Sequence, residues 1–223
     1  MWEGLIVDDS NAIIWIVVLL FVLAVGIPIA LVYWRRSRKL EAFAKANGLG
    51  YQKSNRELPT AYRGVVAATN VLETQSPGGS LVVFQGVFDT GKTTGDDGQP
   101  KMANIVVVRS QLPRRVPRLV CRPRHKLGDL GKSERFLTGD ASFDNKFTCT
   151  TENVQFGTLV LTPQVRQLLL AAQPVFFIAE GQAVSLATKG ALTEKNYQKV
   201  VAQAQAVWAA ADPRAGLPAP GAG

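Results

Sequence analysis

The chain has 223 residues, a net charge of +8 and 47% hydrophobic residues. With two cysteines and one histidine, it lacks the composition of a disulfide framework and the ligand spacing of a zinc site. Charge is unevenly distributed, because all 25 Lys and Arg follow residue 34 and three of the 17 acidic residues precede residue 12. The part after residue 34 thus has 25 basic and 14 acidic residues, a net +11 that suits contact with a polyanion such as an anionic membrane.

Residues 12–34 contain no Asp, Glu, Lys, Arg or His. At 1.5 Å per residue this stretch is about 34 Å long, enough to cross the roughly 30 Å hydrocarbon core with modest tilt. A single uncharged helix of this kind is an anchor rather than an ion path. Gly26 and Pro28 predict a kink, and Gly26 with Ala30 makes a small-xxx-small pair that would allow a weak helix-mediated dimer.

The flanks of this stretch predict its orientation. The N-terminal side is acidic and has no basic residue, whereas a signal peptide starts with basic residues and has a shorter apolar run. Four basic residues follow the stretch: Arg35, Arg36, Arg38 and Lys39. By the positive-inside bias, we expect a single-pass cell-membrane protein with its N-terminus outside and its C-terminal domain in the cytoplasm.

The remaining chain divides by composition and periodicity. We expect an acidic extracytoplasmic N-terminus at 1–11, a transmembrane helix at 12–34, a basic juxtamembrane helix at 35–48, a cytoplasmic α+β domain at 49–212, and a disordered Pro/Gly/Ala tail at 213–223. Strands are predicted near 50–53, 65–72, 81–89, 103–109, 118–122 and 146–150, with a hairpin turn at 76–79 and a mobile loop at 90–101.

The C-terminal third predicts two helices and two further strands. The first helix is expected at 163–172 after the cap Thr162, and the second begins at Thr193. Between them, 175–178 and 183–187 are expected to pair around Gly181. The fold class is therefore α+β, a largely antiparallel sheet with covering helices. The alternative is a pleckstrin-like barrel with a C-terminal helix, a plan from which the helix at 163–172 departs.

Cys121 and Cys149 each lie in an apolar, strand-like run. In a cytoplasmic domain both would be reduced, small core residues. A disulfide between them would be credible only with the opposite orientation of the chain.

Residues 86–93 (GVFDTGKT) match the spacing of a phosphate-binding loop. That site needs a helix after the lysine, whereas Lys92 is followed by Gly, Asp and Pro, which cannot sustain a first helical turn. We therefore expect no nucleotide site, no metal, no cofactor and no enzyme activity, and keep a membrane-bound NTPase only as an alternative.

A basic cluster is the better candidate for function. Seven cations and no acid occur within 18 residues: Arg109, Arg114, Arg115, Arg118, Arg122, Arg124 and Lys126. The prolines among them predict an extended, loop-like segment with its charges directed outward. It could bind anionic lipid headgroups or an acidic protein. The segment has no aromatic residue for base stacking, so membrane-tethered nucleic-acid binding is the weaker alternative.

From Trp34 onward the order of short motifs resembles a group of uncharacterised single-pass membrane proteins of actinobacteria and their phages. The similar pieces are Trp34-Arg35-Arg36, Phe43-Ala44, Gly48, Asn70-Val71-Leu72, Val83-Phe84, Leu112-Pro113, Phe143-Asp144, Phe147, Leu161-Thr162-Pro163 and Leu168-Leu169-Leu170. The group has no established activity, so the resemblance assigns no functional residue. From these features we expect a membrane-anchored cytoplasmic binding or scaffold module that engages anionic lipid through its basic segment.

Overall fold

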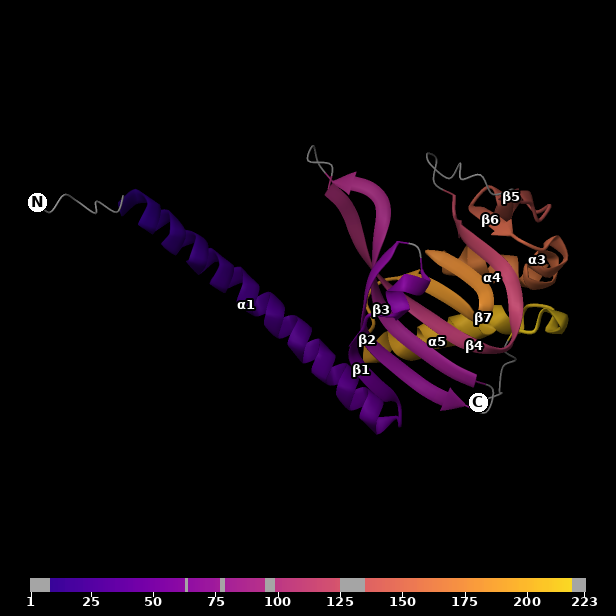
Figure 1. Ribbon diagram of the computed structural model, residues 1–223, viewed down its shortest axis with the longest axis horizontal. Coiled ribbons are helices and arrows are strands. Elements are labelled where there is room, and N and C mark those ends of the chain that lie inside the picture. Colours follow the sequence, from indigo (N-terminus) through magenta and orange to yellow (C-terminus); the bar gives the residue numbers. More distant parts are fainter. Residues whose placement is uncertain (1–8, 63, 77–78, 95–98, 125–134, 218–223) are drawn as a thin grey trace, which may run out of the picture.

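The computed structural model describes residues 9–62, 64–76, 79–94, 99–124 and 135–217. A long helix, α1 (Asp9–Ala46), leads into one antiparallel sheet covered by helices, which confirms the predicted α+β class (Figure 1). The strands are β1 (Gly50–Asn55), β2 (Val65–Ser76), β3 (Gly79–Thr94), β4 (Gln99–Pro123), β5 (Arg135–Phe136), β6 (Phe147–Thr151) and β7 (Phe176–Lys189). The helices are α2 (Ala141–Asp144), α3 (Val154–Val160), α4 (Pro163–Ala172) and α5 (Glu194–Ala209), with 3-10 turns η1 (Leu58–Ala61) and η2 (Pro213–Ala215).

Helix α1 is a candidate membrane span. Its described apolar window has a mean hydropathy of 3.0 and no part of it is buried in the protein, unlike the core helix of a soluble domain. The helix continues without interruption through Pro28 and into the segment 35–48 expected as the basic juxtamembrane helix, and it ends at Ala46. In Figure 1 it extends away from the domain over most of its length and joins the sheet only at its C-terminal end.

Strand β4 organises the sheet. The strand order is β1-β2-β3-β4-β6-β5, and β7 pairs with the other side of β4. We predicted two separate strands at 103–109 and 118–122, which is wrong, because β4 runs continuously from Gln99 to Pro123. Between two paired positions, Gln111 with Ala183 and Val116 with Gly181, β4 has four residues where β7 has one. This bulge accommodates the prolines and bends the strand without ending it.

Two more predictions need correction. Residues 90–101 were expected as a mobile loop, but β3 extends to Thr94 and β4 begins at Gln99, so most of this segment forms the end of a hairpin. Residues 175–178 and 183–187 were expected to pair with each other, yet both halves of β7 pair with β4. β7 bends at Gly181 (φ +58), a conformation that glycine adopts readily.

Each face of the sheet has its own core. On the helical face, α4, α5 and the end of α1 pack on the sheet through residues such as Leu169, Trp208 and Leu40. The second core, on other sheet residues, includes Tyr62 and Phe84, with Leu58 of η1 packed against it. The side chains of Thr162 and Thr193 cap α4 and α5, as predicted. Two helices, α4 and α5, cover one face of the sheet. This arrangement differs from the pleckstrin-like alternative, which has a barrel and one C-terminal helix.

The start of the expected tail is ordered. Asp212 caps η2, whose Ala215 is buried, and Leu217 packs against the core of the helical face. The prediction that residues 213–223 are disordered is therefore wrong for 213–217, because two apolar side chains hold this turn on the domain. Residues 218–223 lie outside the described part of the chain.

Candidate membrane-proximal site

Arg36 joins the candidate span to the sheet domain. Its Nε donates to the carbonyl oxygen of Leu192 at 2.9 Å, and its terminal nitrogen donates to Oε1 of Gln85 at 3.0 Å. The Gln85 oxygen also accepts the backbone N–H of Leu192, at 3.2 Å. Hydrogen bonds to a charged donor are stronger than neutral ones, so this cluster, which we call the Arg36 clamp, fixes α1 against β3 and the segment before α5.

A second polar contact lies one residue further along α1. The oxygens of Ser37 and Tyr51 are 2.6 Å apart, and the Tyr51 hydroxyl donates to Oδ1 of Asn70 at 3.0 Å. Asn70 sits in a bulge of β2 with φ +50, a left-handed conformation that asparagine tolerates better than most residues. Leu40 and Ala44 then bury themselves in the core. The end of α1 is therefore part of the domain.

The other juxtamembrane cations remain exposed. Arg35 and Lys39 face outward, and Arg38 lies 5.5 Å from the centre of the Trp34 ring, a cation–π distance. Arg38 also approaches Glu41 at 3.9 Å, but both side chains are more than half exposed, so this pair contributes little to stability. Arg36 thus has a structural position that its three basic neighbours lack.

The described basic residues of the segment 109–126 differ in exposure and in partners. Arg114 donates to the carbonyl oxygen of Arg214 at 2.7 Å, Arg115 is exposed, and Arg118 pairs with Glu180 at 3.4 Å. Arg122 is half-buried and Arg124 is exposed, while Lys126 lies outside the described residues. Figure 1 places this half of β4 on the side of the domain away from α1. The structure therefore separates these cations from the juxtamembrane set and holds them on a strand.

Arg109 belongs to a different environment. It is half-buried and hydrogen-bonds to Tyr62, whose hydroxyl is 2.8 Å from the Ser185 hydroxyl. Burial raises the pKa of Tyr62, while the Ser185 hydrogen bond and Arg109 oppose this rise. Arg109 therefore supports a buried polar contact within the second core.

Residues 86–93 do not have the geometry of a phosphate-binding loop. Residues 86–93 run along β3 and pair with β4 from Ile105 to Pro100, where a phosphate loop would turn into a helix. Packing explains the glycine at position 86, because a Cβ there would come within 3.1 Å of the Ile105 side chain and 3.2 Å of the Val65 side chain. Nothing in this strand presents free helical N–H groups to a phosphate.

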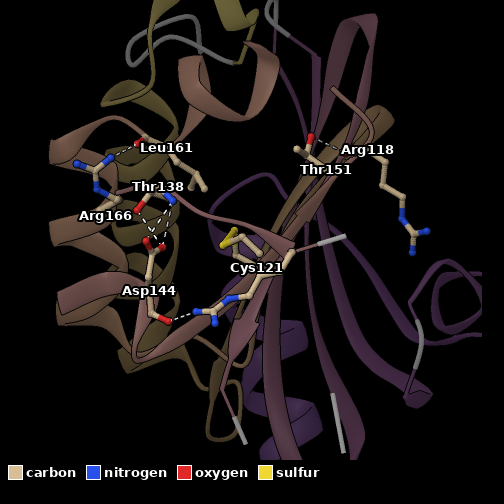
Figure 2. The surroundings of a disulfide bond; sticks show 9 residues. Arg118, Cys121, Thr138, Asp144, Thr151, Leu161 and Arg166 are labelled. Carbon is tan, nitrogen blue, oxygen red and sulfur yellow. Dashed lines mark hydrogen bonds between the residues drawn. A yellow bond between two sulfur atoms is a disulfide. The ribbon is translucent and has the colours of Figure 1, made fainter. Parts of the chain in front are cut away.

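Cys121 and Cys149 form a disulfide between β4 and β6 (Figure 2). The expectation of two reduced cysteines is therefore wrong for this structure. Hydrogen bonds from Arg124 N to Lys146 O and from Glu152 N to Arg118 O lie three residues to either side. The cysteines consequently occupy a non-hydrogen-bonded pair, where facing side chains approach most closely, and their Cα atoms are 4.2 Å apart. Arg118 points away on the other side of the strand in Figure 2.

A small cavity of about 180 Å³ lies near the disulfide, lined by Phe136, Leu161, Pro163 and Arg166 among others. Arg166, its charged residue, donates to Asp140 at 3.2 Å and to the Leu161 carbonyl at 2.9 Å. The Ser142 hydroxyl, together with the Phe143 N–H and Arg166, lowers the pKa of Asp140. These bonds tie α4 to the segment before α2, so we assign Arg166 to the fold.

Sequence reasoning missed the partners of the Arg36 clamp. Gln85 is only 6% exposed. It directly follows the apolar run 81–84, and a glutamine in that position could have been recognised in the sequence as a buried polar residue that needs a hydrogen-bond partner. Leu192 takes part through its backbone, and no sequence pattern marks a backbone acceptor. The Cys121–Cys149 pairing likewise follows from the register of β4 and β6.

Comparison with known proteins identifies a similar fold. No protein-family model and no curated protein matches the chain. One similar solved structure is the crystal structure of the mycobacterial trehalose monomycolate transport factor A, TtfA. The two share 12% sequence identity with a TM-score of 0.53, over 76% of this chain and 90% of that chain. At this identity the likeness shows a shared α+β fold and nothing more specific.

Proposed function

We propose that this chain is a non-enzymatic, membrane-anchored module that binds a partner at the membrane surface. The observation that carries the proposal is the continuity of α1, whose apolar part is exposed and whose end is clamped into the domain core. A domain held this way stays beside the bilayer. The similar solved structure belongs to a protein titled a transport factor, and a non-enzymatic accessory role is in keeping with that title.

The three exposed juxtamembrane cations are the proposed lipid contact. Arg35, Arg38 and Lys39 follow the apolar segment directly, where each cation near an anionic leaflet gains roughly 1 kcal/mol. The cations from Arg114 to Arg124 are on or directly after the half of β4 that Figure 1 places away from α1, and they suit an acidic protein partner instead. Of the basic residues predicted from the sequence, the proposed attachment to lipid therefore uses Arg35, Arg38 and Lys39.

This division gives a charge-reversal prediction. Full-length protein in nanodiscs should transfer more tryptophan excitation energy to dansyl-phosphatidylglycerol than to dansyl-phosphatidylcholine, because the anionic lipid gathers at the cations. Replacing Arg35, Arg38 and Lys39 with Glu should abolish the difference. The matched control reverses Arg114 and Arg115, and should keep it. Equal transfer to both lipids in the wild type, or loss of the difference in the control, would contradict the proposal.

For the orientation, we propose that the domain is cytoplasmic, as the four basic residues after residue 34 predict. The disulfide is the observation that opposes this orientation, since stable disulfides belong to oxidising compartments. In the cytoplasm, Cys121 and Cys149 would be kept reduced during growth and would pair only on oxidation.

One experiment on intact cells tests this orientation. A fluorescent protein fused to the C-terminus should fluoresce, and the same fusion to alkaline phosphatase should be inactive. Acid-quenched cells treated with a maleimide-polymer should show both cysteines modified. An active phosphatase together with cysteines that react only after reduction would place the domain outside the cell.

A further inference from the structure

The domain begins at the boundary of the candidate span, without a flexible joint. Trp34 is the last residue before the charged segment, and the Arg36 clamp lies two residues later, about 3 Å along the helix axis. Leu40 and Ala44, one and two turns further, are 1% and 0% exposed. The segment between Trp34 and the clamp is helical and is held by the span at one end and by the domain at the other. The direction of α1 therefore sets the position of the domain relative to the bilayer.

Strands β3 and β4 extend beyond the level of the clamp. Gln85 pairs with Val106, and from there β3 continues for nine residues to Thr94 while β4 runs beside it from Gln99. At about 3.3 Å per residue, the seven residues of β4 from Val106 to Gln99 extend roughly 23 Å past the clamp, and β3 covers the same length with a bulge between Asp89 and Thr93. We call residues 86–94 and 99–104 the hairpin arm. Figure 1 shows it projecting from the domain on the same side as the membrane-spanning half of α1.

Two described side chains of the arm suit a membrane surface. Met102 pairs with Asp89, four residues and about 13 Å beyond Gln85, and is 43% exposed. Lys101 beside it is exposed, and its carbonyl accepts the Thr90 hydroxyl at 2.7 Å, which ties the two strands at this level. A methionine can enter the boundary of the acyl chains. Lys101 leaves the opposite face of the strand, but its long side chain can extend along the edge of the arm so that its ammonium group reaches the phosphates.

We infer that the hairpin arm, through Lys101 and Met102, rests on the phospholipid headgroup layer of the membrane that α1 crosses. This inference rests on the proposed membrane anchor. It also gives the tilt of the span a direction, because an apolar segment of about 34 Å in a roughly 30 Å core tilts, and the arm occupies one side of the helix. The span should lean so that the arm lies on the surface instead of entering the hydrocarbon.

The test uses full-length protein in nanodiscs of phosphatidylcholine and phosphatidylglycerol. An NBD fluorophore is attached at Met102→Cys without reductant, so that the disulfide stays intact, and lipids carrying a headgroup nitroxide are added. NBD at position 102 should lose most of its fluorescence. The control Val154→Cys, 65% exposed on α3 and away from α1, should keep its fluorescence. Equal, weak quenching at 102 and 154 would overturn the inference.

A third site separates this failure from failure of the anchor. NBD at Val18→Cys, in the apolar part of α1, should be quenched by lipids with a nitroxide on the acyl chain. Quenching at 18 without quenching at 102 rejects the arm contact alone. Absence of quenching at 18 rejects the anchor and with it the arm contact.

Arg36 is the positioning residue in this arrangement. Arg36→Ala removes the clamp and should reduce headgroup quenching at 102 while acyl-chain quenching at 18 stays unchanged. Arg36→Lys keeps the positive charge on a single donor nitrogen, in place of the two nitrogens of Arg36 that contact Leu192 and Gln85, and should restore part of the quenching at 102. If NBD at position 102 is quenched as strongly in Arg36→Ala as in the chain with Arg36, the clamp does not position the arm and the role inferred for Arg36 is wrong.

Discussion

Removing the Cys121–Cys149 disulfide is expected to lower the free energy of unfolding of the oxidised protein by roughly 3–4 kcal/mol, since the bond closes a loop between residues 28 apart in sequence. Both cysteines are buried, and among the described strands β6 is paired with β4 on the side of the main sheet and with the short β5 on its other side. Without the bond, the unfolded chain regains the conformations that the closed loop excluded, and β5, β6 and α3 depend on strand pairing and packing alone.

Thermal unfolding of the Cys121→Ala, Cys149→Ala double variant measures this loss. A decrease of this size should lower Tm by roughly 7–14 °C for a domain of this length. Reductant should lower the Tm of the wild type and leave that of the double variant unchanged, which separates the cross-link from the packing of the sulfur atoms. A wild-type Tm that is the same with and without reductant, after reduction has been verified, would contradict the prediction.

The second large effect is expected at Leu40. Leu40→Ala should reduce the free energy of unfolding of the sheet domain by about 2–5 kcal/mol, the range for truncating a buried leucine. The reason is that Leu40 is 1% exposed in the core of the helical face, although it belongs to the helix that carries the candidate membrane span. Loss of this side chain leaves a cavity between α1 and the sheet.

Leu31→Ala provides the matched control. Leu31 lies on the same helix but is 46% exposed and outside the domain core. Unfolding of the full-length chain in detergent, followed by calorimetry, should show a lower Tm for Leu40→Ala and no change for Leu31→Ala. If both variants behave like the wild type, the end of α1 does not contribute to the stability of the domain.

Local patterns in the sequence predicted the elements whose causes are local. Helix α4 was predicted with both ends correct, because Thr162 and Pro163 mark its start and Gln173-Pro174 marks its end. In the structure Gln173 takes the left-handed conformation there. The fold class followed in the same way, from an apolar helix, short β-rich runs and an amphipathic C-terminal segment. Capping and periodicity act over a few residues, so they can be read without tertiary contacts.

Strand β4 shows why other elements were not predictable. Pro113 and Pro117 interrupt the local pattern of a strand, and only the pairing with a bent β7 explains why β4 continues through them. The candidate site depends on tertiary structure in the same way. Arg36 is bound to Gln85 and Leu192, 49 and 156 residues away, and no spacing rule connects residues so distant. Charge content predicted a basic surface, but the path of the strand decided which cations lie together.

Strand β4 pairs on one edge with β3, which is synthesised before it, and on the other with β7, which is synthesised after it. This order has a consequence for the chain during translation. Ile105 pairs with Lys189, so the second side of β4 stays open until β7 has left the ribosome. At 5–20 residues per second, the interval from Pro123 to Lys189 lasts roughly 3–13 s. During that time the nascent chain presents an unpaired strand edge, the kind of surface that recruits other chains into aggregates. Prolines and arginines at the bend of β4 are poor partners for such pairing, so this segment protects the chain before it is complete.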